Sequence, residues 1–517
     1  MDHGLIAPTT RPKLPSGRTQ RVSDVFDWVL EEAPERVALI GRSGRLSYEQ
    51  LDREVNRAAA VLSARGVAAG DRVAACLPND LPIVVAFLGT IRLGAIWVGV
   101  NRPLAAPEKA WLLEDSGARV YLTSADLAGE IRDRDLVVDE DEWAREMAAA
   151  GDPPRPAACA EIDPFAPAAI AYTSGTTGRP KGAVHSHHNL LLPGAVSAAT
   201  GLYGPDTRQG VVLPLTILNL IVLAPLTAFQ VGSTCVAMDR IDPVGLAEWV
   251  RKERVGHFAA VPTILHDLFT HPDVTAEDLA SLERPMVGGA DCPEEFRSLY
   301  RERFGKEVGI GYGMTEAPTA VTSASGAPAD KPGLCGTALP QIEIHILGDD
   351  DEPLPPGEVG EICVGPARTG EWAGVYTPML GYWKRPDATR EVLRGGLYHT
   401  GDIGFLEAGG DLYIRGRRNE LILRGGANVY PAEVERVLGE HPSVVAAAVF
   451  GLPDERLGER VVAVLQLGDP ATTEELLAHV RSELARYKTP AEIRFVDEMP
   501  RNAMGKIVKR ELEALFC

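Results

Sequence analysis

Short apolar segments alternate with amphipathic segments along the first half of the chain, and this alternation constrains the fold more than any other feature. Apolar residues Leu51, Val55, Ala59 and Leu62 recur at helical spacing, and the strand-like segment "RVAACL" follows at residues 72–77. Further apolar segments and one helical segment continue the alternation: "ARVYLT", "PAAIAYT", "GVVLPL", "GSTCVAM" and "PVGLAEWVRKE". The pattern favours an α/β fold with a substantial parallel sheet. The acidic, Pro- and Ala-rich residues 139–164 predict a surface connection.

The last hundred residues predict a separate, small α+β unit. Pro431 stands at the start of a helical segment, and Thr472 with Glu475 forms a capping-box signature before another. Three strand-like segments lie among these helices: "VVAAAVFG", "RVVAVLQL" and "AEIRFV". We therefore predict two domains, residues 1–418 and residues 419–517.

Composition excludes several classes of protein. The 517 residues carry a formal net charge of −20, which argues against a general nucleic-acid binder. Seven scattered cysteines without a CxxC pair fit reduced thiols of the cytoplasm better than a disulfide framework or zinc site. The N-terminus has no apolar signal segment, and no apolar run is long enough to span a bilayer. These features predict a soluble cytoplasmic protein, a monomer or homodimer, without integral membrane contact.

The segment "YTSGTTGRPKG", Tyr172–Gly182, combines glycines, hydroxyls and two basic residues, a composition suited to phosphate. It is not the common P-loop, because Pro180 replaces the glycine before the lysine and Gly182 replaces the magnesium-binding hydroxyl. The loop therefore predicts a nucleotide site in which another segment supplies the metal ligand.

Four more motifs follow this loop in order, each with a carboxylate or a cation beside a glycine turn. They are "GYGMTE" at 311–316, "YHTGD" at 398–402, "GRRNELILRGGANVYPAEVE" from Gly416 and "PRNAMGKIVKREL" with Lys506. Taken together with the loop, the chain resembles the adenylate-forming superfamily of acyl-CoA synthetases, peptide-synthetase adenylation domains and firefly luciferases. The resemblance implies a large N-terminal α/β domain of mixed and parallel sheets and a small mobile α+β C-terminal lid. It also implies ATP, Mg2+ and coenzyme A as cofactors and substrates.

The resemblance assigns a role to most of these residues. Lys506, Thr315 and Glu316 would be catalytic: Lys506 bridging the substrate carboxylate and the α-phosphate, Thr315 on the α-phosphate and Glu316 on magnesium. Gly425 and Gly426 would let the pantetheine arm of CoA pass once the lid rotates at Asn419. The remaining residues would bind ATP or AMP: Thr173, Ser174, Gly175, Thr176, Thr177, Gly178, Lys181, Gly289, Ala290, Gly311, Tyr312, Asp402 and Arg417.

Several positions depart from the family pattern, among them Thr216, where phenylalanine is usual, and Gly416, where aspartate is common. Ile217 stands where histidine is usual in the stretch that shapes the acyl pocket, and Asn419 stands at a hinge that is often Asp or Lys. We predict an acyl pocket that includes Ile217, Leu218 and Gly288. Because residues 213–226 and 286–290 contain no Arg or Lys, the variable end of the acid is expected to be apolar or aromatic. His187 and His188 are interpreted as structural.

The leading functional hypothesis is an acid–thiol ligase that converts ATP and a carboxylic acid into an acyl-adenylate and then acyl-CoA. The alternative keeps the adenylation and changes the acceptor to a carrier protein, an amine or another small nucleophile. A binding protein without turnover is a third class, disfavoured by the presence of both Glu316 and Lys506.

Overall fold

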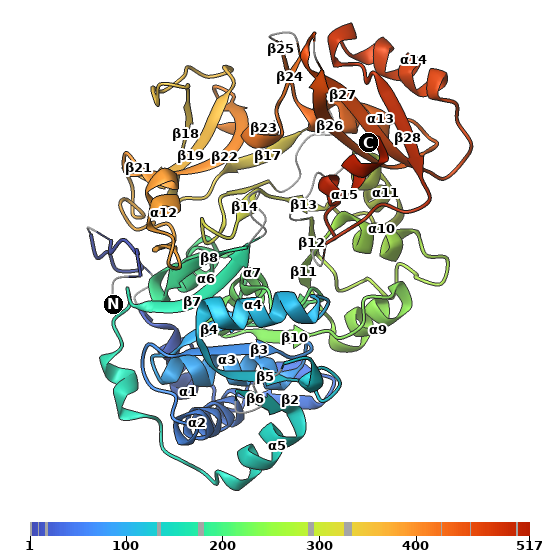
Figure 1. Ribbon diagram of the computed structural model, residues 1–517. Helices are drawn as coiled ribbons and strands as arrows, with labels where there is room; N and C mark the ends of the chain where they lie inside the picture. Colours follow the sequence, from blue (N-terminus) through green and yellow to red (C-terminus); the bar gives the residue numbers. More distant parts are fainter. Residues whose placement is uncertain are drawn as a thin grey trace. The chain divides into compact units, whose positions relative to one another are not determined.

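The computed structural model describes residues 3–8, 10–15, 19–131, 136–173, 180–287, 294–324, 333–424, 427–454, 456–502 and 505–516 (Figure 1). The chain forms two compact units. The first combines Met1–Ile344 with Val364–Tyr398, and the second combines His345–Cys363 with His399–Cys517. The domain division near residue 418 stays a prediction. In the described ranges, every helix is too short or too polar to span a lipid bilayer.

One seven-stranded sheet of the first unit carries the phosphate-loop motif. Its order is β20-β8-β7-β4-β3-β5-β6. The strands are β3 (Arg72–Cys76), β4 (Ile96–Gly99), β5 (Ala118–Thr123), β6 (Val137–Asp139), β7 (Pro167–Thr173), β8 (Lys181–Ser186) and β20 (Gly381–Tyr382). The strands from β7 to β6 run parallel, as predicted, while β8 is antiparallel to both β7 and β20. The motif therefore joins two adjacent antiparallel strands.

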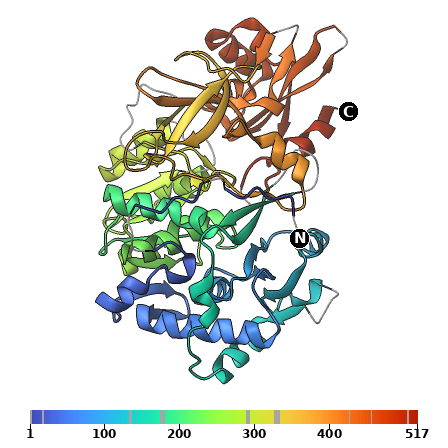
Figure 2. The ribbon, with the colours of Figure 1, turned by 90° about the vertical axis from the view of Figure 1, so that its left-hand side faces the viewer.

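Helices of this sheet follow the apolar spacing of the sequence. In α2 (Tyr48–Ala64), Leu51, Val55 and Leu62 are buried, and Ser47 and Gln50 form a capping box. This helix packs against α3 (Leu81–Arg92), which packs against β4 (Figures 1 and 2). The helix α4 (Ala106–Ser116) packs against β5.

Residues 139–164 connect β6 to β7 and are mostly exposed or half-buried, as predicted, but the segment also has regular structure. The segment contains α5 (Glu140–Ala149), capped by Asp139, whose carboxylate accepts the backbone N–H of Glu142. Acidic residues in the first turn suit the positive end of the helix dipole. Arg65, the C-cap residue of α2, pairs with Glu146 at 2.6 Å, so an acidic side chain of α5 also holds this helix against its neighbour.

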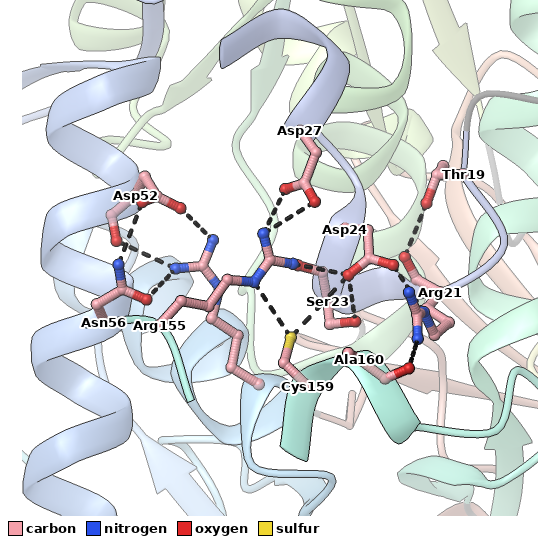
Figure 3. A network of polar contacts seen from close by, with 11 residues as sticks. Thr19, Arg21, Ser23, Asp24, Asp27, Asp52, Asn56, Arg155, Cys159 and Ala160 are labelled. Atoms are coloured by element: carbon pink, nitrogen blue, oxygen red, sulfur yellow. Dashed lines mark hydrogen bonds and ion pairs between the residues drawn. The ribbon is translucent and has the colours of Figure 1, made fainter. Parts of the chain in front are cut away.

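After α5 the same segment is fixed by a network of polar contacts (Figure 3). The Arg155 guanidinium donates to both carboxylate oxygens of Asp27 at 2.8 Å and to Asp24 at 2.7 Å. Its Nε lies 3.3 Å from Sγ of the buried Cys159. These contacts tie residues 155–160 to the first turns of the chain and explain why the segment is ordered without a sheet of its own.

A second seven-stranded sheet lies in the first unit, with order β13-β12-β11-β9-β10-β1-β2. Its strands are β1 (Val37–Gly41), β2 (Gly44–Ser47), β9 (Arg208–Val211), β10 (Thr234–Ala237), β11 (His257–Ala260), β12 (Arg284–Val287) and β13 (Gly309–Ile310). Helices of this part of the chain are α1 (Asp27–Glu32), α6 (His187–Thr200), α7 (Leu218–Ile221), α8 (Thr227–Val231), α9 (Pro243–Glu253), α10 (Pro262–Thr270), α11 (Glu294–Phe304) and, further along, α12 (Pro386–Val392). Buried Val250, Phe258 and Leu268 belong to one apolar core against this sheet.

The second unit contains two sheets and matches the predicted α+β architecture. One includes the order β23-β22-β19-β18, with β18 (Ile342–Leu347), β19 (Gly360–Pro366), β22 (Leu397–Leu406) and β23 (Asp411–Arg417). The other has β24 (Ile422–Arg424), β25 (Ala427–Val429), β26 (Val444–Asp454), β27 (Gly458–Leu467) and β28 (Glu492–Val496). Its helices are α13 (Pro431–Gly439), α14 (Thr473–Glu483) and α15 (Lys509–Glu513). Pro431 begins α13 and Thr472 caps α14 with Glu475, as the sequence predicts.

Candidate active site

A short hairpin presents the "GYGMTE" motif. Strand β14 (Gly313–Met314) pairs with β15 (Thr319–Ala320), so Thr315 and Glu316 lie in the connection between them. The strands approach so closely that a Cβ on Gly313 would lie 2.0 Å from the carbonyl oxygen of Thr319. Glycine is therefore required here for packing of the hairpin, and the hairpin in turn fixes where Glu316 emerges.

The carboxylate of Glu316 accepts hydrogen bonds from neutral donors. Its Oε1 lies 2.9 Å from the hydroxyl of Tyr382 and 3.4 Å from Oγ1 of Thr173, the last residue of β7. Its backbone carbonyl accepts the N–H of Met379 at 3.0 Å. Across the described ranges no basic side chain forms an ion pair with this half-buried carboxylate.

Lys181 lies on the same face of the sheet as Thr173 and Tyr382. Thr173 and Lys181 are cross-strand partners, as are Tyr382 and Ala183, and alternate residues of a strand share a face. The ammonium of Lys181 lies 5.2 Å from the centre of the Tyr382 ring, within cation–π range. The structure thus brings two predicted residues, Thr173 and Lys181, together with a third, Glu316.

Packing alone accounts for the glycine after that lysine. A Cβ on Gly182 would lie 2.6 Å from the side chain of Ile170 and 3.2 Å from the ring of Tyr172. The hydroxyl that a P-loop places at this position has no room here. That another segment supplies the metal ligand stays a prediction.

Tyr312 and Gly311 lie just before the hairpin. The N–H of Tyr312 donates to Oγ1 of Thr322 at 3.0 Å, and a Cβ on Gly311 would lie 2.8 Å from the Thr322 carbonyl. The ring of Tyr312 is half-buried. These contacts hold the aromatic ring beside the motif, and its adenine contact stays a prediction.

Three buried histidines follow Lys181 in the chain: His185 in β8, and His187 and His188 at the start of α6. Burial lowers the pKa of His185 to about 4, and a contact with the backbone of Thr315 opposes the shift in part. Burial likewise lowers the pKa of His187 to about 4. His188 stacks on Phe165 and contacts the Val375 carbonyl at 2.8 Å. The buried neutral rings fit the structural interpretation of His187 and His188.

The predicted acyl segment forms an irregular apolar helix. Ile217 precedes α7, which continues through a π-helical turn at Val222–Leu226 into α8. Leu218 is buried and Ile217 is half-buried. Thr216, just before them, donates to Oδ1 of Asn101 at 2.6 Å. Turns of π-helix recur at functional sites, but contact of these residues with an acyl group stays a prediction.

In the second unit, Asp402 and Arg417 face each other across a strand pair. They are direct partners of β22 and β23, and Nε of Arg417 lies 3.1 Å from Oδ1 of Asp402. Asp402 is buried and its N–H donates to Oγ1 of Thr400 at 3.0 Å. The structure therefore joins the two predicted ribose-site residues in one ion pair.

A buried carboxylate that the sequence reasoning missed, Glu361, supports this turn. It accepts the N–H of Gly401 at 3.1 Å and lies 3.2 Å from Nδ1 of His399 and 3.4 Å from the guanidinium of Arg418. Cys363, His399 and Glu361 offer potential metal-ligand atoms within 4.8 Å of one another. Because the backbone N–H and Arg418 already satisfy Glu361, hydrogen bonds and an ion pair account for this cluster without a metal.

The lid residues occupy tight turns. Lys506 is exposed, its backbone N–H donates to Oδ1 of Asn502 at 3.0 Å, and Gly505 before it has a φ of +75°, which favours glycine. Asn419 lies in a single 3-10 turn, Arg418–Glu420. Strands β24 and β25 pair as far as Arg424 and Ala427.

The remaining predicted residues lie outside the described residues: Ser174, Gly175, Thr176, Thr177, Gly178, Gly288, Gly289, Ala290, Gly425 and Gly426. The sequence reasoning also missed Tyr382. Its segment, "GYWKRP", holds a single tyrosine among apolar and basic residues, a composition that indicates no chemistry. Only the pairing of β20 with β8 places it at Glu316.

Comparison with known proteins identifies the family to which the chain is similar. The family model of the AMP-binding enzyme matches residues 26–383, and the AMP-binding enzyme C-terminal domain matches residues 433–506. A feruloyl-CoA synthase from Amycolatopsis sp is 36% identical over 492 residues, covering 94% of this chain and 96% of the relative. The long-chain-fatty-acid–CoA ligase FadD13 of Mycobacterium tuberculosis is 34% identical, covering 91% and 93%.

Among solved structures, ATP-bound MatB from Rhodopseudomonas palustris superposes with a TM-score of 0.86 at 28% identity, covering 96% of this chain and 99% of MatB. The likenesses confirm the predicted fold class. They also confirm an AMP-forming acid–thiol ligase that makes an acyl-adenylate from ATP and a carboxylic acid and transfers the acyl group to coenzyme A. Matching the family models over most of its length, this chain belongs to the AMP-binding enzyme family.

Proposed function

We propose that Glu316 holds the Mg2+ that accompanies ATP, while Lys181 binds the β- and γ-phosphates and Thr315 the α-phosphate. One observation carries this assignment: Glu316 meets the end of β7 through Thr173 and lies at Tyr382, whose ring contacts Lys181. The carboxylate suits a hard divalent cation because its donors are neutral hydroxyls, which leave its charge available. When bound, Mg2+ neutralises charge on the triphosphate.

The carboxylate and ATP are both anions and repel each other, so the residues of the chain have to offset this repulsion. In the first half-reaction a carboxylate oxygen bonds to the α-phosphorus while the bond to pyrophosphate breaks. Lys506 neutralises the approaching carboxylate and Lys181 the departing pyrophosphate, and holding the groups in line supplies the rest of the rate. Asp402 accepts from the ribose hydroxyls, and Arg417 holds Asp402 in place.

In the second half-reaction the CoA thiolate bonds to the acyl carbon and AMP leaves. We assign the passage of the pantetheine arm to Gly425 and Gly426 and the lid rotation to Asn419, because glycines admit close approach of a ligand to the backbone. The rotation removes Lys506, which the first half-reaction alone needs. The two domains of this proposal are residues 1–418 and 419–517.

The acid is proposed to have an apolar or aromatic end. Residues 218–226 are largely buried and contain no charged side chain, so a second carboxylate would have no cation there to pair with. The two curated relatives are named for a ring-bearing acid and for long-chain fatty acids, both of which fit this chemistry. A cytoplasmic location and a monomeric or homodimeric state stay predictions.

The test is a panel of carboxylic acids assayed for pyrophosphate release with ATP and Mg2+, each with and without CoA, with product masses recorded. The panel includes cinnamic-type, fatty and dicarboxylic acids. An apolar or aromatic acid that gives acyl-CoA supports the proposal. Preference for a dicarboxylate contradicts the pocket assignment, and accumulation of acyl-AMP in the presence of CoA points to a different acceptor.

A further inference from the structure

We propose that Tyr382 is a positioning residue for adenylation: its ring supports the ammonium of Lys181 while its hydroxyl orients the carboxylate of Glu316. The proposal rests on the proposed function, because it takes Lys181 as a phosphate ligand and Glu316 as the Mg2+ ligand. It adds a residue that lies outside the sequence motifs. It also gives a reason why Lys181 and Glu316 can each bind a ligand instead of pairing with each other.

The side chain of Tyr382 contacts both charged groups. The Tyr382 hydroxyl donates to Oε1 of Glu316 at 2.9 Å, and the ring centre lies 5.2 Å from Nζ of Lys181. Tyr382 is 6% exposed. Lys181 and Glu316 form no ion pair with each other, both being among the described residues. A direct pair would neutralise both groups, whereas a neutral tyrosine in contact with both holds each in place and preserves its charge.

Backbone contacts keep the tyrosine from shifting. Its N–H donates to Oγ1 of Thr389 at 2.9 Å, and the next N–H, of Trp383, donates to the carbonyl of Gly182 at 2.7 Å. Gly381 before it has a φ of +132°, and a Cβ there would lie 2.6 Å from the Thr389 side chain. These contacts therefore fix the position of the Tyr382 ring beside β8, the strand that carries Lys181.

The hydrogen bond from the Tyr382 hydroxyl has a carboxylate as its acceptor. Such charge-assisted hydrogen bonds are shorter and stronger than those between neutral groups, so the hydroxyl can fix the orientation of the Glu316 carboxylate.

The experiment separates the two contacts by measuring ATP binding calorimetrically, without acid, with Mg2+ or with EDTA. Tyr382→Phe removes the hydroxyl and keeps the ring, so Mg2+-dependent ATP binding is expected to weaken about tenfold while binding in EDTA changes less than about twofold. Tyr382→Leu removes the ring as well, and binding is expected to weaken in both conditions. Thermal melts of each variant monitor folding.

Tyr376→Phe is the matched control, because Tyr376 is also buried in the same unit and its hydroxyl has no hydrogen-bond partner among the residues that the structure describes. It is expected to bind ATP like the unmodified protein in both conditions. If Tyr382→Phe keeps the full Mg2+ enhancement, or loses affinity equally with and without Mg2+, the positioning role is refuted.

Glu316→Gln, measured alongside, distinguishes failure of this inference from failure of the proposed function. Loss of the Mg2+ enhancement in Glu316→Gln, with retention in Tyr382→Phe, refutes only the role of Tyr382. Retention of the enhancement in Glu316→Gln refutes the metal assignment itself, and the inference falls with it.

Discussion

Two glutamates, Glu316 in the first unit and Glu361 in the second, occupy opposite electrostatic environments. Glu316 is half-buried and accepts from two neutral hydroxyls, with no ion pair among the described residues. Glu361 is buried, accepts a backbone N–H, contacts His399 and pairs with Arg418. The first carboxylate still has charge to offer a ligand, while the second has its charge balanced within the protein. A carboxylate's partners, more than its burial, separate a ligand-binding role from a structural one.

The largest expected effect belongs to Glu316→Gln. The amide keeps the size of the side chain and loses the charge, so acid-dependent pyrophosphate release should fall at least about a hundredfold, by analogy with loss of one transition-state stabilising group. The melting temperature should barely change, because the hydroxyl donors still find an oxygen acceptor. Pyrophosphate release and thermal melts measure both. A variant with a lowered melting temperature and an unchanged rate of pyrophosphate release would contradict this prediction, because Glu316 would then have a structural role.

Glu361→Gln should show the reverse pattern. Loss of this charge weakens the contacts to His399 and Arg418. We expect the free energy of unfolding to fall by about 1–2 kcal/mol; the value is kept small because Arg418 is partly exposed and solvent screens the pair. Pyrophosphate release at saturating ATP should fall much less than in Glu316→Gln. Urea unfolding gives the stability, and equal catalytic loss in the two variants would erase the distinction.

The first unit should also lose stability in acid. The pKa of buried His187 is lowered to about 4, below the ordinary 6.5. Between these values the unfolded chain binds a proton that the folded chain excludes, so stability present above pH 6.5 falls as the pH drops toward 4. The loss is at most about 3 kcal/mol for this side chain.

His187→Leu tests this directly, since within the described part of the chain neither ring nitrogen has a hydrogen-bond partner. Urea unfolding at pH 7 and pH 5 should show a smaller drop in stability for the variant than for the unmodified protein. If the free energy of unfolding falls equally in both proteins, titratable groups other than His187 cause the loss of stability in acid.

The smallest effect is expected for Asp349→Asn. Asp349 pairs with Arg418 at 2.6 Å, yet its side chain is 98% exposed, and solvent screening leaves such pairs little net free energy. The melting temperature and the pyrophosphate rate should both match the unmodified protein. A measurable loss here would show that Arg418 depends on its exposed partner as well as on Glu361.

The strand–helix alternation predicted the parallel sheet, because both depend on local patterns of apolar residues. In the structure Thr173 and Lys181 lie near Glu316, and Asp402 pairs with Arg417. The roles of these residues in binding ATP stay predictions. Tyr382 and Glu361 could not be found from the motif order, since each acquires its role from strand pairing between distant segments. The helix α5 was missed because its acidic composition obscured a capping aspartate, Asp139.

The pairing of β20 with β8 joins residue 382 to residue 183, and that of β1 with β10 joins residue 39 to residue 235. Such distant closures form slowly, because the loop entropy is lost before the contacts are made. During synthesis on the ribosome, β8 leaves one edge with unpaired N–H and C=O groups until residues 381–382 emerge. The strand that carries Lys181 is therefore also an edge open to misassociation while the chain is being made.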